Sequence, residues 1–132
     1  MNYTASGTLT NLSSFIRMDD KKYKWFKIAA SRDELYLVPA GKIFSLQVNS
    51  KNVCVTLFDE KLFAFAAKCP HAGGFFEDGY IDAVGNVVCP VHRYKFNMSN
   101  GRNSSGEGYY LKTYPVEERP EGVYLGMEKG WF

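Results

Sequence analysis

The chain has 132 residues, a length that suits one domain with a buried core. Aromatic residues make up 16% of it and are spread along its length, which excludes a disordered or low-complexity chain. Its 16 basic and 14 acidic residues are interspersed and give a formal charge of +2, so no field of one sign points to nucleic acid or to an acidic membrane.

Residues 1–23 mix Ser, Thr, Asn, Asp and Lys without a sustained period, which predicts an extended or partly ordered N-terminal arm. The stretch lacks the basic region and following apolar region of a signal peptide, and no run of about 18 apolar residues occurs in the sequence. We therefore expect a cytoplasmic protein, with residues 24–132 forming its one folded domain.

Short β-rich runs separated by turn signals follow the arm. They are residues 25–30, 42–48, 53–58 and 62–67. Ser31 and Glu34 have the spacing of a capping box and predict one short helical turn, and residues 58–62 predict the turn of a hairpin. Cys54 lies between apolar neighbours and is expected to be a core thiol. This rhythm predicts an all-β chain.

Two short segments each bring one cysteine and one histidine, namely Cys69 with His71 and Cys89 with His92. Two thiolates and two imidazoles can close a tetrahedral zinc site. They also suit a 2Fe-2S cluster with two cysteines on one iron and two histidines on the other. Zinc fingers usually group their cysteines in one turn and their histidines in one helix, so the mixed pairing favours the cluster.

The second segment is followed by further strand signals. Residues 93–98 predict a strand, and residues 110–116 and 122–126 are expected to pair around a type I turn at 119–122. Strands therefore flank the two metal-binding segments on both sides, which predicts antiparallel sheets carrying a small inserted subdomain.

Taken together, these residues resemble the Rieske family, in particular its small soluble ferredoxins. The likeness runs from about Trp25 to about Met127 and is most specific at the four ligand positions. It is carried by Cys69-Pro70-His71-Ala72-Gly73-Gly74, Asp78-Gly79-Tyr80-Ile81-Asp82, Cys89-Pro90-Val91-His92, Phe96 and Asn100-Gly101-Arg102. The resemblance implies an antiparallel β-sandwich or barrel base with a cluster-binding subdomain at about residues 68–96.

The resemblance also implies which residues bind the cofactor, one Rieske-type 2Fe-2S cluster. Cys69 and Cys89 would hold the inner iron, and His71 and His92 the outer one. The implied function is that of a soluble one-electron carrier between a reductase and an oxygenase or reductase, with redox proteins and neither nucleic acid nor membrane as partners. No catalysis by the chain itself is expected, because it has only two histidines and no Gly-rich dinucleotide loop.

Two other functions stay open. Residues 106–116 also resemble the small subunit of assimilatory nitrite reductase, which would place the chain in a complex with a large subunit. The other is a structural zinc-binding interaction module without redox chemistry. Colour distinguishes the zinc module from the electron carrier and from the nitrite reductase subunit, because an iron-sulfur protein is brown-red and a zinc protein is colourless.

Four positions depart from the respiratory Rieske type. That type has an additional cysteine in each ligand loop, where this chain has Gly74 and Val91, so no disulfide can join the loops. It also has hydroxyl donors where this chain has Tyr94 and Phe96, and Tyr94 is expected to pack as an aromatic under the second loop. Fewer donors near sulfur predict a potential at the low end of the Rieske range, near about −150 mV.

The remaining expectations concern the loops around the site. Gly73, Gly74 and Gly79 are expected either to let backbone N–H groups approach sulfur or simply to make turns. The segment 104–110 is rich in glycine and lacks proline, so its cover of the cluster is expected to be loose or to depend on Tyr109.

Overall fold

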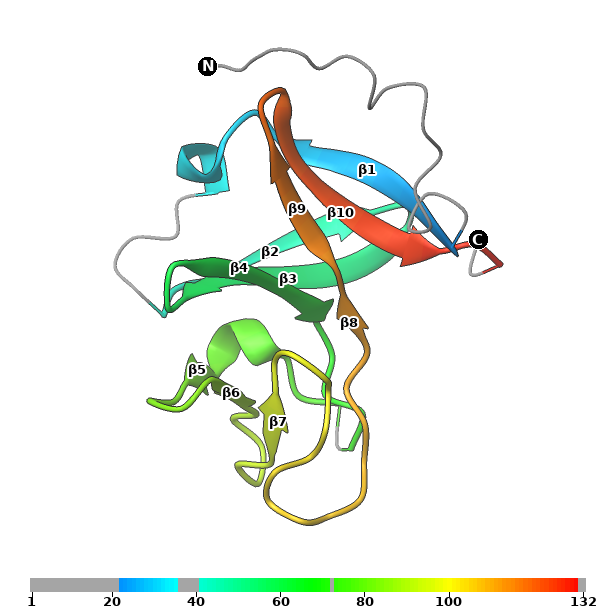
Figure 1. Ribbon diagram of the computed structural model, residues 1–132. Helices are drawn as coiled ribbons and strands as arrows, with labels where there is room; N and C mark the ends of the chain where they lie inside the picture. The colour runs from blue at the N-terminus through cyan, green and yellow to red at the C-terminus, as the bar shows by residue number, and fades with distance from the viewer. Residues whose placement is uncertain (1–21, 36–40, 72, 131–132) are drawn as a thin grey trace.

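The computed structural model describes residues 22–35, 41–71 and 73–130, and its strands form three antiparallel sheets (Figure 1). One sheet has the order β1 (Tyr23–Ala29), β10 (Gly122–Glu128), β9 (Val116–Arg119). The second has the order β2 (Ile43–Val48), β3 (Lys51–Phe58), β4 (Lys61–Ala66), β8 (Thr113–Tyr114). The third has the order β5 (Tyr80–Ile81), β6 (Asn86–Val88), β7 (Lys95–Asn97).

Helical structure in the described ranges is limited to short elements. The 3-10 helices are η2 (Arg32–Leu35) and η3 (Phe76–Asp78). No helix among the described residues is long and apolar enough to cross a membrane. The all-β prediction is therefore confirmed.

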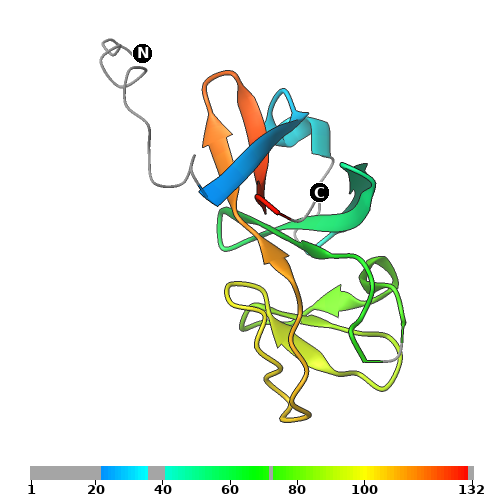
Figure 2. The same cartoon turned by 90° about the vertical axis from the view of Figure 1, so that its right-hand side faces the viewer.

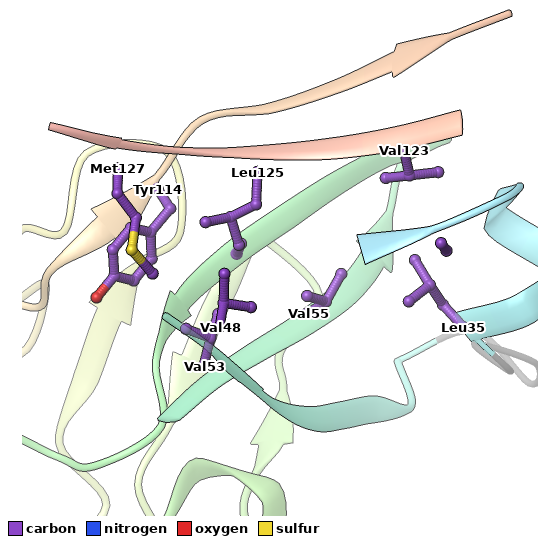
Figure 3. Packing of buried hydrophobic residues seen from close by; sticks show 10 residues of the cluster. Leu35, Val48, Val53, Val55, Tyr114, Val123, Leu125 and Met127 are labelled. Atoms are coloured by element: carbon purple, nitrogen blue, oxygen red, sulfur yellow. The ribbon is translucent and has the colours of Figure 1, made fainter. Parts of the chain in front are cut away.

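The first two sheets face each other and form the base of the molecule, with buried side chains between them (Figure 3). On β10 the inward residues are Val123, Leu125 and Met127, and on β3 they include Val53 and Val55. Alternate residues of a strand point to one face, which is why these positions are two apart. Each side chain of this size stabilises the fold by about 1.5–3 kcal/mol when fully buried.

The third sheet and η3 lie at one end of the base and form a smaller unit with its own buried residues (Figures 1 and 2). Three buried phenylalanines connect this unit to the base. Phe76 of η3 meets Phe65 of β4 at 5.7 Å between ring centroids, and it meets Phe96 of β7 at 5.9 Å. Both pairs are edge-to-face, with interplanar angles of 89° and 84°, an arrangement that aromatic rings favour.

The strands predicted before the metal-binding segments are confirmed as β1 to β4, with ends that differ by one or two residues. The predicted helical turn is η2, but the Glu34 carboxylate accepts from the N–H of Ala30, at 2.7 Å, and not from Ser31. The predicted hairpin turn is also present, with Asp59 and Glu60 at φ of 52° and 64°. The predicted arm lies outside the described residues up to position 21, and β1 already begins at Tyr23.

The expected pairing of residues 110–116 with 122–126 is largely wrong. Thr113 and Tyr114 form β8 and pair with β4 in the second sheet. The contact with β10 begins at Pro115, whose carbonyl accepts from the N–H of Gly126 at 2.9 Å, and the paired strand runs from Val116. Pro115 stands at the crossing between the two sheets, where its lack of an N–H and fixed φ interrupt a continuous ladder. Strand propensity predicted the extended backbone but not this change of sheet.

The hairpin between β2 and β3 offers a test of backbone strain. Asn49 and Ser50 both have positive φ, at 49° and 67°, as a two-residue type I′ turn requires. We expect Ser50→Gly to raise the free energy of unfolding by about 1 kcal/mol, because a left-handed backbone costs a non-glycine residue about that much. Chemical denaturation measures it. Ser99→Gly, at an exposed turn position without positive φ, is the control and should not stabilise the fold.

Candidate metal centre

The two metal-binding segments fold into loops that are closed in the same way. The N–H of Cys69 donates to the carbonyl of Gly74 at 2.7 Å, and the N–H of Cys89 donates to the carbonyl of Tyr94 at 2.9 Å. A proline follows each cysteine and fixes φ without needing a partner for an N–H. Each loop therefore has its cysteine at its base, on the side of the buried phenylalanines.

The structure brings the two cysteines together. Both side chains are buried, and the thiols interact with each other. Burial raises the pKa of the Cys89 thiol and Cys69 raises it further, while a hydrogen bond from the backbone N–H of Val91 opposes them. Two adjacent buried thiols become thiolates readily only beside positive charge, and bound metal supplies such charge.

The structure also brings the two histidines together, with ring centroids 5.2 Å apart. Their surroundings differ, since His92 is exposed and His71 is half-buried. The Nδ1 atom of His71 is buried and has no hydrogen-bond partner. An unpaired buried polar atom costs about 1–3 kcal/mol, and a bound metal ion would remove this cost.

The arrangement in pairs bears on the kind of metal centre. Within the described part of the chain, no three His, Cys, Asp or Glu side chains are grouped so as to hold one metal ion. A tetrahedral zinc site takes four ligands on one ion. A Rieske 2Fe-2S centre takes two cysteines on one iron and two histidines on the other. A cysteine pair and a histidine pair fit the second donor set better than the first.

Two tyrosines enclose His71. The ring of Tyr94 stacks on it at 4.1 Å between centroids with an interplanar angle of 24°, and the ring of Tyr109 lies 5.1 Å away. The tyrosine centroids are 5.9 Å apart. Tyr94 thus packs as an aromatic, as predicted, although it packs on the histidine of the first loop. Sequence reasoning did not anticipate that the two histidines would be covered so unequally.

The segment that leads to Tyr109 is anchored to β7 and is not loose. The N–H of Ser104 and the side-chain amide of Asn103 both donate to the carbonyl of Lys95, at 2.8 and 3.0 Å. Ser105 Oγ accepts from the N–H of Lys95 at 3.1 Å. Asn103 Oδ1 also accepts from the N–H groups of Glu107 and Gly108. Sequence reasoning missed Asn103, whose place before a Ser-Ser-Gly stretch is typical of a side-chain-stabilised turn.

Of the three glycines near the site, Gly74 and Gly79 are required for steric reasons. A Cβ on Gly74 would lie 3.0 Å from Cys89 Sγ and 2.8 Å from Val91 Cγ2, so this glycine lets the loops approach each other at the cysteine. A Cβ on Gly79 would lie 2.0 Å from the carbonyl oxygen of Val88, so this glycine serves β5–β6 packing. Gly74 and Val91, the positions of the additional cysteines in the respiratory type, are thus in contact.

We expect Gly74→Ala to lower the metal content per chain, because the added methyl group presses on the sulfur of Cys89 and on Val91. Metal analysis of the purified protein measures it. Adding Val91→Ala removes the tighter of the two contacts and should restore part of the metal content. Full metal content in Gly74→Ala would contradict the expectation.

The second loop contains two residues with a left-handed backbone, His92 at φ 66° and Arg93 at φ 60°. The residue that corresponds to Arg93 in the first loop is Gly73, with φ 75°. A left-handed backbone costs a non-glycine residue about 1–2 kcal/mol. The left-handed backbone at Arg93 also explains why the strand predicted for residues 93–98 begins only at Lys95, as β7.

Cys54 shares a buried apolar cluster with Cys69 and Cys89 and has its expected place in the core. It is fully buried on β3, and burial raises the pKa of its thiol to about 12. A thiol with such a pKa stays protonated at neutral pH and is a poor metal ligand.

Comparison with known proteins gives the following matches. A family model for the Rieske [2Fe-2S] domain matches residues 24–115. The ferredoxin component of the naphthalene 1,2-dioxygenase system from Pseudomonas aeruginosa is 25% identical over 105 residues, 79% of this chain and 96% of that protein. A nitrite reductase [NAD(P)H] from Emericella nidulans is 34% identical over 76 residues, which are 51% of this chain and 7% of that protein.

Solved structures show the same fold. An NADH-dependent nitrite reductase small subunit from Mycobacterium tuberculosis superposes with a TM-score of 0.68 at 19% identity, covering 80% of this chain and 96% of that one. A chain from the complex of reduced oxygenase and oxidised ferredoxin in carbazole 1,9a-dioxygenase superposes with a TM-score of 0.66 at 24% identity, covering 82% and 97%.

Proposed function

This chain belongs to the Rieske [2Fe-2S] family, and on that premise we propose that it carries single electrons from a reductase to an oxygenase. It holds one Rieske-type 2Fe-2S cluster. The proposal is supported by relatives that are ferredoxin components of dioxygenase systems and that this chain covers almost from end to end.

The proposed ligands are Cys69 and Cys89 on one iron and His71 and His92 on the other. The observation that carries this assignment is the buried, unpaired Nδ1 of His71, which lies beside a second histidine in a site that also contains a pair of buried thiols. When bound, the cluster supplies one-electron redox chemistry.

The residues of the chain perform the other tasks of a carrier. The closed loops hold both cysteines away from water, and Tyr94 with Tyr109 covers one face of His71. His92 remains exposed, so its ring edge is where electrons enter and leave.

We further propose that residues 24–132 form the Rieske domain, with a cluster-binding subdomain at about residues 68–96 and an arm at residues 1–23. The segment from Asn103 to Tyr110 serves that subdomain as its cover. We place the protein in the cytoplasm, a proposal supported by Cys54, the cysteine that the proposed cluster does not use, which forms no disulfide, since reducing compartments keep thiols free.

A second candidate function is the small subunit of an assimilatory nitrite reductase. It is supported by the Emericella nidulans relative and by the Mycobacterium tuberculosis structure. The two candidates differ in assembly, because such a subunit would remain bound to a large subunit through size-exclusion chromatography of the native complex, whereas a ferredoxin would elute alone.

The test of the proposed function is spectroscopic. Purified protein should contain equal amounts of iron and acid-labile sulfide, and dithionite should produce a rhombic EPR signal whose average g is below the free-electron value. A midpoint potential near about −150 mV is expected. A colourless, EPR-silent protein that contains zinc and cannot be reconstituted with iron and sulfide would refute the proposal, and a potential well above zero would refute the low-potential assignment alone.

A further inference from the structure

The surface around His92 combines exposed apolar side chains with the exposed ligand. Val91 precedes His92 in the second loop and is 37% exposed. Tyr109, which is 39% exposed, lies alongside, because it packs near Tyr94 and His71, and its chain neighbour Tyr110 is 67% exposed. Small, partly apolar contact areas of this kind are typical of brief encounters between redox proteins.

Three cationic residues lie on or next to the segments that carry these side chains. Arg93 directly follows His92, and Arg102 pairs in a β-bridge with Tyr110. Lys68 lies against the first loop, with its Cε 3.1 Å from where a Cβ on Gly73 would stand. We call Lys68, Arg93 and Arg102 the cationic rim.

The rim differs from the arginines of the base in having no carboxylate partner within the described residues. In the base, Arg32 pairs with Glu118 at 2.7 Å and Arg119 pairs with Glu117 at 2.9 Å. An unpaired arginine keeps its charge and all its donors available to an outside group.

Acidic residues of the small unit do not cancel this charge. Glu77 and Asp78 lie on η3, which packs toward β2 of the base. Asp82 accepts three hydrogen bonds within the β5–β6 turn, and Lys95 faces it. Glu107, whose carboxylate accepts from the hydroxyl of Ser105, places one negative charge near Tyr94 and His71, which reduces the positive charge of the three cationic residues without cancelling it.

The backbone at Arg93 supports a role for its side chain. Its φ of 60° suits glycine, and the corresponding position of the first loop is Gly73. Backbone strain tends to be retained where it serves function. Arg93 is exposed beside His92 and has no carboxylate partner among the described residues, so its side chain is available to a group outside the chain.

We propose that the face formed by Val91, His92 and the two tyrosines, with its cationic rim, docks a redox partner whose own electron-exchange site is ringed by carboxylates. This inference rests on the proposed electron-carrier function. The sign of the rim supplies the argument: carboxylates opposite Lys68, Arg93 and Arg102 would speed encounter and orient the partner so that its redox centre meets His92.

Small charged oxidants test the charge of the surface around His92, where electrons leave the protein. Reduced holoprotein is mixed in a stopped-flow instrument with ferricyanide, which takes one electron to become ferrocyanide, over a range of ionic strength. The rate should fall as salt is added, and with a cationic cobalt(III) phenanthroline complex it should rise. Arg93→Gly and Arg102→Gln should each slow ferricyanide at low salt by about threefold or more and weaken the salt dependence.

The matched control is Lys27→Gln, which removes one positive charge from the exposed surface of β1 in the base. Each variant's potential is measured so that rates are compared at equal driving force. Arg93→Gly should also raise the melting temperature, which would separate docking from folding. The proposal is overturned if rim variants and control react alike, or if salt accelerates ferricyanide. If the protein forms no cluster, its EPR spectrum shows this before the kinetic experiment, and that result refutes the proposed electron-carrier function and not the docking surface.

Discussion

Cys89→Ser abolishes cluster binding and lowers the melting temperature, and this is the largest effect we expect from a single substitution. A serine hydroxyl is a much weaker iron ligand than a thiolate at neutral pH, and the loss leaves Cys69 without the partner it contacts. A tightly bound group stabilises the folded state by about 4 kcal/mol when present at a thousand times its dissociation constant, so the cluster's contribution to stability is lost as well.

Cys54→Ala is the matched control, since it also removes a fully buried thiol from the same apolar cluster as Cys89. It should keep the iron and sulfide content and the reduced EPR signal, with only the moderate cost of a small cavity. Iron analysis measures the cluster content of both variants, and calorimetry measures their melting temperatures. Equal loss of iron in the two variants would show that Cys89 acts through packing alone and would contradict its proposed role as a ligand.

Phe76→Ala is expected to lower the free energy of unfolding by about 3–5 kcal/mol, the usual cost of removing a buried aromatic ring. Phe76 is fully buried between Phe65 of β4 and Phe96 of β7, so its loss removes the edge-to-face contact that joins the small unit to the base and a second one within the unit. Denaturation of the apoprotein followed by circular dichroism measures the effect without a contribution from the cluster.

Phe75→Ala provides a control one residue away, because that ring is 47% exposed. It should cost less than about 1 kcal/mol. Comparable losses in both variants would mean that the backbone around η3, and not the buried ring, holds the unit in place.

The elements that could be predicted from the sequence are those with local signals. Alternating apolar residues and turn dipeptides identified β1 to β4 and the turn at Asp59 and Glu60. The cysteines and histidines identified the two loops, because few chemistries need that mixture of ligands in two short segments. These signals act within a few residues of each other, which is why one sequence sufficed.

The features that escaped prediction depend on residues far apart in the chain. The crossing at Pro115 is decided by which sheet edge lies nearby, and a strand pattern does not encode that. The unequal cover of His71 and His92 arises because Tyr94 and Tyr109 meet over one ring after the cover segment binds β7. Asn103 stabilises that segment through bonds to residues on both sides of it.

The pairing of β4 with β8 has a consequence for how such a chain can change over time. The backbone leaves the base at the end of β4 and returns at β8, and these strands are hydrogen-bonded neighbours, with Ala64 opposite Tyr114 and Phe65 opposite Thr113 (Figure 1). The intervening segment is thus an excursion whose two ends meet. Insertions or deletions within it alter the length of a loop that the sheet already closes, at a cost that grows only slowly with length. The sequence of the small unit and its loops can therefore change while the strands of the base keep their pairing.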